Sequence, residues 1–523
     1  MIGIGMTPDR ASDARPTLAR TLLENVEALA IAVVMALILK YFLIEAYKIP
    51  TGSMQPGIMG DPVADISDRV LVNKLVYLLR DPERYEVVVF KNPLWERQNY
   101  IKRLVGFGGE RICLRNGDVF VTPKGGSEAI ARKPDEIWRS VRKELLPRHD
   151  GDVDLTKVFQ VESGGAHVAA DRITIPTEPN GECRLRTKDP IRDHYLDGYH
   201  EKWTEAYALS NSREAAAAKY ARVVGNDVSD LEIAADVTPA MDAKQIVFEI
   251  REHGRTFVLE LPVASGKDPG QGAAAGRGLM TCAATVDGDT VAWEAPAADA
   301  SLPALRPGVT THVSFRNGDD ELVAELEGHG CDAVLRRKYR TKGVDPDRDP
   351  TTRAQLLTHV AIRTSGSFAL DDLGLWRDIH YLPDGDPNGG SPSENYTIPD
   401  DEFMVLGDNT QNSWDCRQWK RATYTFKDGA TISGNYFNDS LLSDDSEPVN
   451  SESNPWSRGS DIHFRNDYGQ EYVFPRTDLR GDDVDPEWTN VHSVPKKLLL
   501  GKALAVFWPL PPFSSTWRFK WVR

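Results

Sequence analysis

The sequence predicts a mainly β protein: an N-terminal transmembrane helix, then a β-rich core interrupted by a large inserted β-sandwich of jelly-roll type. Three observations favour this fold class. One long apolar run lies near the N-terminus, short β-branched runs alternate with Gly, Asn and Asp turns, and about six to eight evenly spaced strands follow residue 244. The chain has 523 residues and a formal net charge of −16, which argues against a nucleic-acid partner.

Residues 1–25 are a polar tail, and residues 26–47 are predicted to form the transmembrane helix, because about 20 apolar residues span a bilayer. Three upstream arginines, Arg10, Arg15 and Arg20, favour a cytoplasmic N-terminus. The chain would then be a single-pass protein of the cell (cytoplasmic) membrane, with everything after residue 47 extracytoplasmic. A cleaved signal peptide and a buried helix are the alternatives, although no small-x-small cleavage site closely follows the apolar block.

The core is expected in three pieces, residues 48–121, 400–419 and 491–523. The last piece would contribute a returning strand and a tail. Strands are expected at Arg69–Asn73, Glu86–Phe90, Tyr100–Val105, Phe403–Leu406 and Leu498–Trp508, with a hairpin over Arg111–Val121 that turns at Asn116-Gly117-Asp118.

Two insertions separate these pieces. Residues 122–399 should be mixed at first, with helices at Pro134–Leu146 and Trp203–Arg222, and a β-sandwich from about residue 244 with a hairpin at Asn317-Gly318. Residues 420–490 are acidic and are expected to form an insertion or a long loop. The five cysteines contain no CxxC pair, so a zinc or redox motif is not indicated and their pairing stays open.

The stretch Ile49–Pro56 places Ser53 between glycine and proline residues directly after the apolar run. A serine nucleophile needs a base and oxyanion donors, but no histidine occurs between residues 48 and 121. A buried lysine can act as the base once its pKa falls toward the working pH. Lys102 is the candidate, and strand alternation should turn its neighbour Arg103 to the opposite face.

Four segments together resemble the conserved boxes of type I signal peptidases, the bacterial leader peptidases of family S26, which use a Ser–Lys dyad. They occur in the family's order behind the apolar run, and they are Thr51–Pro56, Asp68–Lys74, Tyr100–Gly106 and Gly407–Arg417. The family's catalytic unit is β-rich, in agreement with the strands expected here.

The resemblance implies a role for each matched residue. Ser53 would be the acylating nucleophile and Lys102 its neutral general base. Thr51 and the Ser53 N–H would form the oxyanion hole, and Ser413 would orient the lysine amine.

The resemblance also implies a structural ion pair between Asp408 and Arg417, supported by Asp415. Shallow pockets for small substrate side chains would be lined by Ile49, Met54 and Ile101.

The implied activity is removal of signal peptides from secreted preproteins after small-x-small sites, through a Ser53 acyl-enzyme and without metal or cofactor. Partners would be those preproteins, the lipid bilayer and, as a further candidate, the secretion translocon; no nucleic acid is expected. One alternative is a membrane-anchored binding protein that uses the jelly-roll-like insertion beside an inactive peptidase core. Another is a self-cleaving Ser–Lys protease of the repressor type. A separate S-x-x-K match, Ser140 to Lys143, has no KTG partner and is interpreted as chance.

Overall fold

The fold is described here from a computed structural model. It describes residues 18–38, 43–61, 66–146, 148–149, 152–177, 182–199, 226–252, 254–264, 277–284, 291–294, 301–328, 332–340, 357–383, 395–436, 457–458, 461–468, 470–480, 486–508 and 519–523. The predicted helix at 203–222 lies outside these residues.

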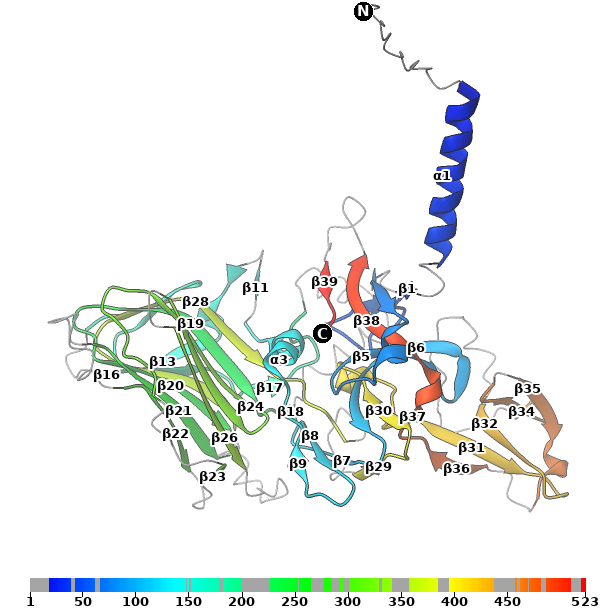
Figure 1. Ribbon diagram of the computed structural model, residues 1–523. Coiled ribbons are helices and arrows are strands. Elements are labelled where there is room, and N and C mark those ends of the chain that lie inside the picture. Colours follow the sequence, from blue (N-terminus) through cyan, green and yellow to red (C-terminus); the bar gives the residue numbers. More distant parts are fainter. Residues whose placement is uncertain are drawn as a thin grey trace, which may run out of the picture.

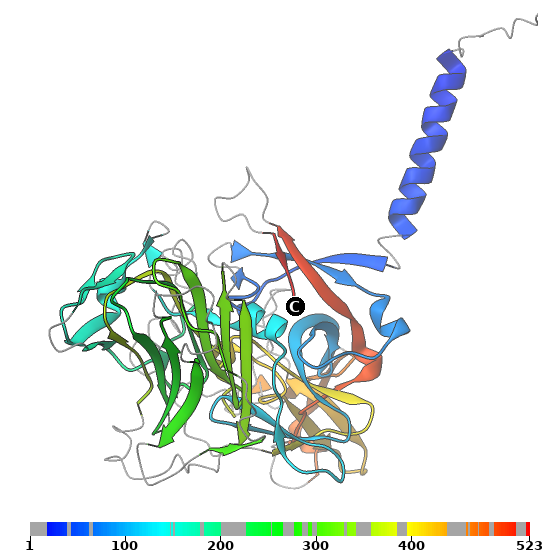
Figure 2. The ribbon, with the colours of Figure 1, turned by 60° about the vertical axis from the view of Figure 1, so that its left-hand side comes forward.

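The N-terminal helix α1, Leu18–Ile38, projects away from the β-rich body (Figures 1 and 2). The predicted helix over 26–47 is wrong in its last part, because Ile44–Lys48 forms strand β1 and pairs with β4, Arg69–Asn73. In a strand Glu45 and Tyr47 lie on the same face, where the Tyr47 hydroxyl donates a hydrogen bond to Glu45. Glu45 also pairs with Lys74, at 3.2 Å, and these contacts stabilise the strand. Among the described residues no helix is both long and apolar enough to cross a membrane.

The core is built on a sheet with the strand order β1-β4-β38-β5-β6-β30-β37, to which β39 adds beside β38. The further strands are β5 (Val87–Asn92), β6 (Trp95–Phe107), β30 (Glu402–Leu406), β37 (Val494–Pro495), β38 (Leu499–Trp508) and β39 (Lys520–Trp521). The predicted returning strand is confirmed, since β38 pairs with both β4 and β5. Strands from both ends of the chain thus complete one sheet.

A four-stranded sheet, ordered β29-β7-β8-β9, adjoins this core. Its strands are β7 (Arg111–Arg115), β8 (Asp118–Thr122), β9 (Ala129–Ile130) and β29 (Asn395–Thr397). The predicted hairpin is confirmed, with Asn116 and Gly117 at positive φ in its turn. Side chains alternate along β5, so Val88 packs in the larger apolar cluster of the core and Val87 packs in a smaller cluster that also contains Ile49 and Met54.

The insertion forms a β-sandwich of a nine-stranded and a six-stranded sheet. The first holds β10 (Lys143–Glu144), β14 (His167–Val168), β15 (Ile173–Ile175), β19 (Leu231–Pro239), β23 (Ala292–Trp293), β24 (Thr311–Gly318), β25 (Glu321–Glu327), β26 (Ala333–Arg340) and β28 (Phe368–Arg377). The second holds β13 (Phe159–Ser163), β16 (Glu182–Thr187), β20 (Gln245–Glu252), β21 (Arg255–Pro262), β22 (Leu279–Ala284) and β27 (His359–Ser365).

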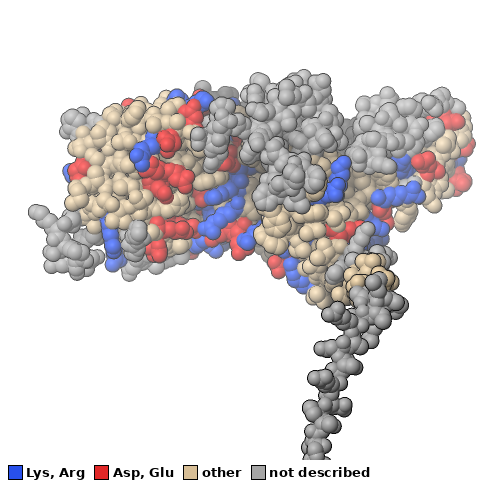
Figure 3. Space-filling view, turned by 90° about the horizontal axis from the view of Figure 1, so that it is seen from above, with Lys and Arg blue, Asp and Glu red and all other residues tan. Residues whose placement is uncertain are grey.

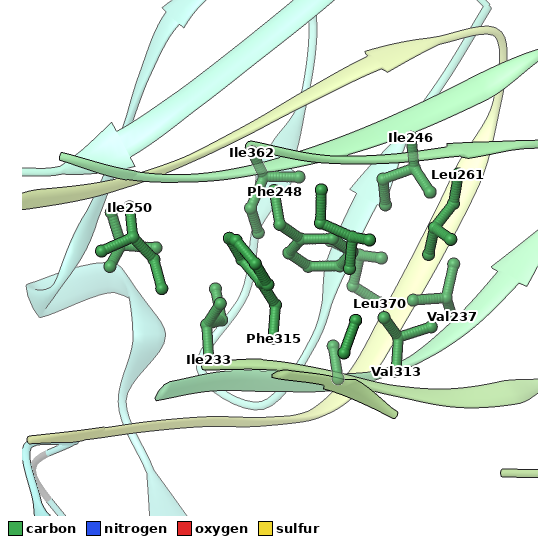
Figure 4. Packing of buried hydrophobic residues seen from close by; sticks show 14 of the residues in the cluster. Ile233, Val237, Ile246, Phe248, Ile250, Leu261, Val313, Phe315, Ile362 and Leu370 are labelled. Carbon is green, nitrogen blue, oxygen red and sulfur yellow. The ribbon is translucent and has the colours of Figure 1, made fainter. Parts of the chain in front are cut away.

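Figure 4 shows the sandwich core, where Phe248 and Ile362 from one sheet face Phe315 and Val313 from the other. The predicted hairpin at residues 317–318 is confirmed as β24–β25. Strands of the sandwich begin with β10 at Lys143, well before the predicted start near 244, because the early strands are short and carry polar residues on their outer face. The helix expected over 134–146 ends at Val141 as α3 (Asp135–Val141), and β10 follows it.

Residues of the acidic segment form a third β unit with its own small apolar cluster, so the insertion expected there is not a plain loop. Its strands are β31 (Lys420–Thr425), β32 (Thr431–Tyr436), β33 (Ser457–Arg458), β34 (Asp461–Asn466), β35 (Glu471–Pro475) and β36 (Glu487–Asn490). The remaining short elements are α2 (Val76–Leu79), β2 (Gly60–Asp61), β3 (Ile66–Ser67), β11 (Arg148–His149), β12 (Asp152–Val153), β17 (Arg192–Asp193) and β18 (Asn226–Asp227). Acidic and basic side chains lie interspersed on the face seen in Figure 3. Of the cysteines in the described residues, Cys113, Cys183 and Cys416 are buried and Cys282 is partly buried.

Candidate active site

The segment from residue 49 to residue 60, called the nucleophile loop below, leaves β1 and is fastened to the second predicted box. The Ile49 N–H donates to the Asp68 carbonyl at 2.9 Å, and the Met59 N–H donates to Asp68 Oδ2 at 2.7 Å. One aspartate therefore holds both ends of the loop. Ser53 lies between these ends and is only 3% exposed.

The fourth predicted box holds the middle of the nucleophile loop. The Asn409 N–H donates to the Ser53 carbonyl at 3.1 Å, and Asn409 Nδ2 donates to the Gly52 carbonyl at 3.0 Å. Gly407 permits this approach, since a Cβ there would lie 2.5 Å from the Ser53 carbonyl oxygen and 2.1 Å from Ser413 Oγ. Two segments separated by the whole sandwich insertion thus meet at the serine.

Lys102 lies on β6 opposite Val88, and its side chain is 2% exposed. Its charge reaches Asp415: burial raises the pKa of that carboxyl, but Arg417, and to a smaller extent Lys102, bring it below its ordinary value. Ser413 Oγ donates to Asp415 Oδ2 at 2.7 Å. Asp415 therefore links the lysine, the serine predicted to orient it, and Arg417.

The predicted ion pair between Asp408 and Arg417 is wrong. Asp408 receives two hydrogen bonds from Arg103, at 2.8 and 2.7 Å, and Arg417 instead binds both oxygens of Asp415, each at 2.8 Å. Both pairs are buried. Strand alternation explains the exchange: Lys102 and Arg103 point to opposite faces of β6, and both faces are covered, so the second cation also needs a buried partner.

The three predicted pocket residues lie in one small apolar cluster behind the nucleophile loop. Ile49 and Met54 are buried in it, and Ile101 is partly buried against it. Thr51 is half-buried. Its backbone packs closely on Gly60, since a Cβ added to Gly60 would lie 2.6 Å from the Thr51 carbonyl oxygen. The structure thus gathers every predicted site residue into one region.

Sequence reasoning missed several residues that hold this site. Asn409 lies in the fourth box but has no predicted role there, although its backbone and side chain both bind the nucleophile loop. Gln55 is fully buried and donates through Nε2 to the Gly60 carbonyl at 3.0 Å. Tyr195 and Tyr199 come from the insertion; Tyr199 binds Gln55 of the same loop, and Tyr195 binds Asn409. The match of the box around Ser53 could have flagged Gln55, but no local pattern marks the two tyrosines.

Carboxylates that could bind a metal lie elsewhere. In the described residues the oxygens of Asp118, Asp230 and Asp319 approach one another within 4.8 Å, where the β7–β8 hairpin meets the sandwich. The cluster already has a cation, because the buried Lys133 ammonium lies 2.6 Å from Asp319 Oδ1 and 2.5 Å from Asp378. Burial and the neighbouring carboxylates raise the pKa of Asp118 and Asp230.

Comparison with known proteins supports the resemblance. A family model described as signal peptidase, peptidase S26, matches residues 22–173. A probable signal peptidase I-2 of Synechocystis is 37% identical over 110 residues, which are 20% of this chain and 47% of that protein. Signal peptidase I P of Bacillus subtilis subsp. natto is 30% identical over 138 residues, 26% of this chain and 65% of that protein. The chain thus spans about half to two thirds of these relatives.

Solved structures resemble this chain only loosely. A carbohydrate-binding module CBM66 from Bacillus subtilis aligns with 42% of this chain and 95% of its own at 5% identity and a TM-score of 0.22. The exoplasmic domain of VIP36 aligns with 46% of this chain and 90% of its own at 10% identity and a TM-score of 0.26. Such low scores give these likenesses no weight for function. The family model and the sequence matches together support the similarity of residues 22–173 to type I signal peptidases, peptidase family S26.

Proposed function

We propose that this chain is a serine endopeptidase that removes signal peptides from secreted preproteins, with Ser53 as nucleophile and Lys102 as general base. The observation that carries the proposal is the meeting of three sequence-distant segments around one serine: Asn409 binds the carbonyls of Gly52 and Ser53, while Lys102 and Ser413 lie about Asp415. Structural serines and lysines do not need such an arrangement.

The proposed reaction begins when Ser53 Oγ attacks the scissile carbonyl and passes its proton to the Lys102 amine. Only the neutral form of a lysine amine can take this proton. The oxyanion would accept hydrogen bonds from the Ser53 N–H and the Thr51 hydroxyl. Collapse of the intermediate expels the new N-terminal amine, which takes the proton from Lys102. A water molecule, deprotonated by the same lysine, then hydrolyses the Ser53 ester.

Ser413 and the apolar residues have supporting roles in this proposal. Ser413 donates its proton to Asp415, so its oxygen is left to accept a hydrogen bond from the protonated lysine during the reaction. Small substrate side chains would lie against Ile49, Met54 and Ile101, where an apolar cluster ends beside the nucleophile loop. Asp408 and Asp415, each held by an arginine, would keep the fourth box in place.

Membrane attachment is proposed through the N-terminal segment. Apolar side chains of α1, including Leu22, Val26 and Leu29, are exposed, and the helix stands clear of the body in both ribbon views (Figures 1 and 2). Burying such side chains in lipid would lower the free energy of the protein. The nucleophile loop follows β1 directly, so this attachment would hold Ser53 near the bilayer surface, where signal peptides, the lipid and the translocon meet.

The test is processing of a preprotein by the purified chain. Ser53→Ala and Lys102→Ala should each abolish cleavage, because one removes the nucleophile and the other its base. Ser140→Ala removes the serine of the S-x-x-K match, and Lys74→Ala removes a half-buried lysine paired with Glu45; both should retain cleavage. Sedimentation of the same proteins with lipid vesicles, with and without residues 1–38, measures attachment.

Cleavage that survives Ser53→Ala or Lys102→Ala would overturn the dyad. Loss of cleavage only in Ser140→Ala would move the nucleophile to the other motif. A wild-type chain that never cleaves would favour the binding-protein alternative.

A further inference from the structure

A short piece of the insertion, Asp193–Tyr199, lies against the nucleophile loop; it is called the bracing segment below. The Tyr199 hydroxyl donates to Gln55 Oε1 at 2.7 Å. Gln55 is fully buried two residues after Ser53, and its Nε2 donates to the Gly60 carbonyl. The tyrosine therefore fixes a side chain that links the middle of the nucleophile loop to its C-terminal end.

The second tyrosine of the bracing segment binds the fourth box. The Tyr195 hydroxyl oxygen accepts hydrogen bonds from Asn409 Nδ2 at 3.1 Å and from Asn412 Nδ2 at 3.2 Å. Asn409 Nδ2 also donates to Gly52, so Tyr195 orients the amide that holds the residue before Ser53. The two tyrosine rings stack with centroids 6.0 Å apart, which makes them one unit.

The bracing segment is in turn fixed to the sandwich. Arg377, fully buried at the end of β28, pairs with Asp193 and, at 2.6 Å, with Asp197. Burial alone would raise the pKa of Asp193, but Arg377 and Lys143 hold it at about 2, so the ion pair persists at neutral pH. Gln411 Nε2 donates to Asp193 Oδ2 at 2.7 Å, which ties the segment to the fourth box again.

Contact at Gly198 brings the segment close to the loop backbone. Gly198 has φ +77°, and a Cβ there would lie 3.2 Å from Pro56 Cγ and 3.3 Å from Lys143. The segment is therefore packed between the sandwich and the nucleophile loop without room for a larger residue. A movement of the sandwich would therefore displace Gln55 and Pro56 in the nucleophile loop and Asn409 in the fourth box.

We propose that the sandwich insertion is a working part of the active site, and that Tyr195 and Tyr199 are positioning residues which hold Ser53 in its reactive place. The inference rests on the proposed function of Ser53. The tyrosines touch neither substrate nor the reacting atoms; they act through Gln55 and Asn409. Since a misplacement of about 1 Å in a reacting group can cost on the order of 100-fold in rate, such fixing affects turnover directly.

The test uses the full chain with Tyr199→Phe and Tyr195→Phe, which remove a hydroxyl and keep the ring. Tyr339→Phe is the matched control, because its buried hydroxyl donates to Asn317 Oδ1 at 2.6 Å inside the sandwich. Tyr199→Phe should lower kcat about three- to tenfold, the effect of one lost neutral hydrogen bond, and Tyr195→Phe, which removes the acceptor of two, should lower it at least as much; KM should stay unchanged in both. The control should lose no kcat. A merely structural role would lower the melting temperature and the fraction of active enzyme but leave kcat per active molecule unaltered.

Hydrogen exchange gives a readout that does not depend on peptidase activity. The amides of Gln55, Ile58 and Asn409 donate to carbonyls of the nucleophile loop. Their exchange should speed up about three- to tenfold in the two positioning variants and stay unchanged in the control. If the wild-type chain cleaves nothing while exchange speeds up, the proposed function fails and the mechanical role of the tyrosines stands. Unchanged exchange together with unchanged kcat would overturn the inference.

Discussion

Gly407→Ala is the sharpest probe of how the fourth box meets the serine. The added methyl group would lie 2.5 Å from the Ser53 carbonyl oxygen, 2.1 Å from Ser413 Oγ and 2.6 Å from Ser413 Cβ. An ordinary contact begins near 3.4 Å, so the Ser53 backbone must move by about 1 Å. Ser413 can rotate away, but a carbonyl within the nucleophile loop cannot yield without displacing its own residue.

The expected result follows from that displacement. Preprotein cleavage should fall on the order of 100-fold, because the nucleophile would leave its reactive position. Overpacking should also lower the free energy of unfolding by about 1–3 kcal/mol. Cleavage rate is measured under single-turnover conditions, and stability by urea unfolding. Gly126→Ala is the control, since its nearest neighbour would be a proline side-chain atom at 3.3 Å. A Gly407→Ala protein that cleaves at the wild-type rate would refute this account of the site.

Two further predictions concern buried charge. Arg103→Met removes the bidentate partner of the buried Asp408 and should lower the free energy of unfolding by about 3–5 kcal/mol. Arg115→Met removes the more exposed ion pair with Glu128 and should lower it by at most about 1 kcal/mol. Equal losses of unfolding free energy in the two variants would contradict this prediction. Burial raises the pKa of Glu252 to about 7 from 4.5, so its stabilising contribution is complete below about pH 4.5 and is lost as pH rises to about 7. As pH rises from about 4.5 to about 7, the free energy of unfolding of Glu252→Gln, measured with urea, should therefore increase by on the order of 3 kcal/mol relative to that of wild type. A difference between the two proteins that does not change with pH would show that the carboxyl is not titrating in this range.

Local sequence was sufficient for many of the strands and for the identity of the site. β5, β7, β8, β24 and β25 carry short apolar runs or apolar alternation bounded by turn residues, and those patterns depend only on neighbours in the chain. Ser53 and Lys102 were found because their boxes match a family in order. The predicted end of the N-terminal helix was wrong because it depends on a distant part of the chain. The local sequence of Ile44–Lys48 was interpreted as a continuation of the helix, but these residues pair with β4 instead.

Ion-pair partners could not be predicted, because they depend on which faces of β6 become covered. Sequence placed Lys102 and Arg103 on opposite faces, but only the packed sheet shows that both faces are buried and that Arg103 must take Asp408. Arg417 then pairs with Asp415, two residues away.

What the sequence determined by itself was a β-rich core behind an apolar segment and its resemblance to signal peptidases, from which Ser53 and Lys102 are predicted as nucleophile and base, since that resemblance rests on short contiguous motifs. The tertiary structure alone decided how the sandwich relates to that core. Tyr195 and Tyr199 reach Gln55 and Asn409 because Arg377 fixes their segment from a strand far along the chain. Hydrogen bonds between such distant residues follow from the packing of whole sheets, and no local pattern carries that information.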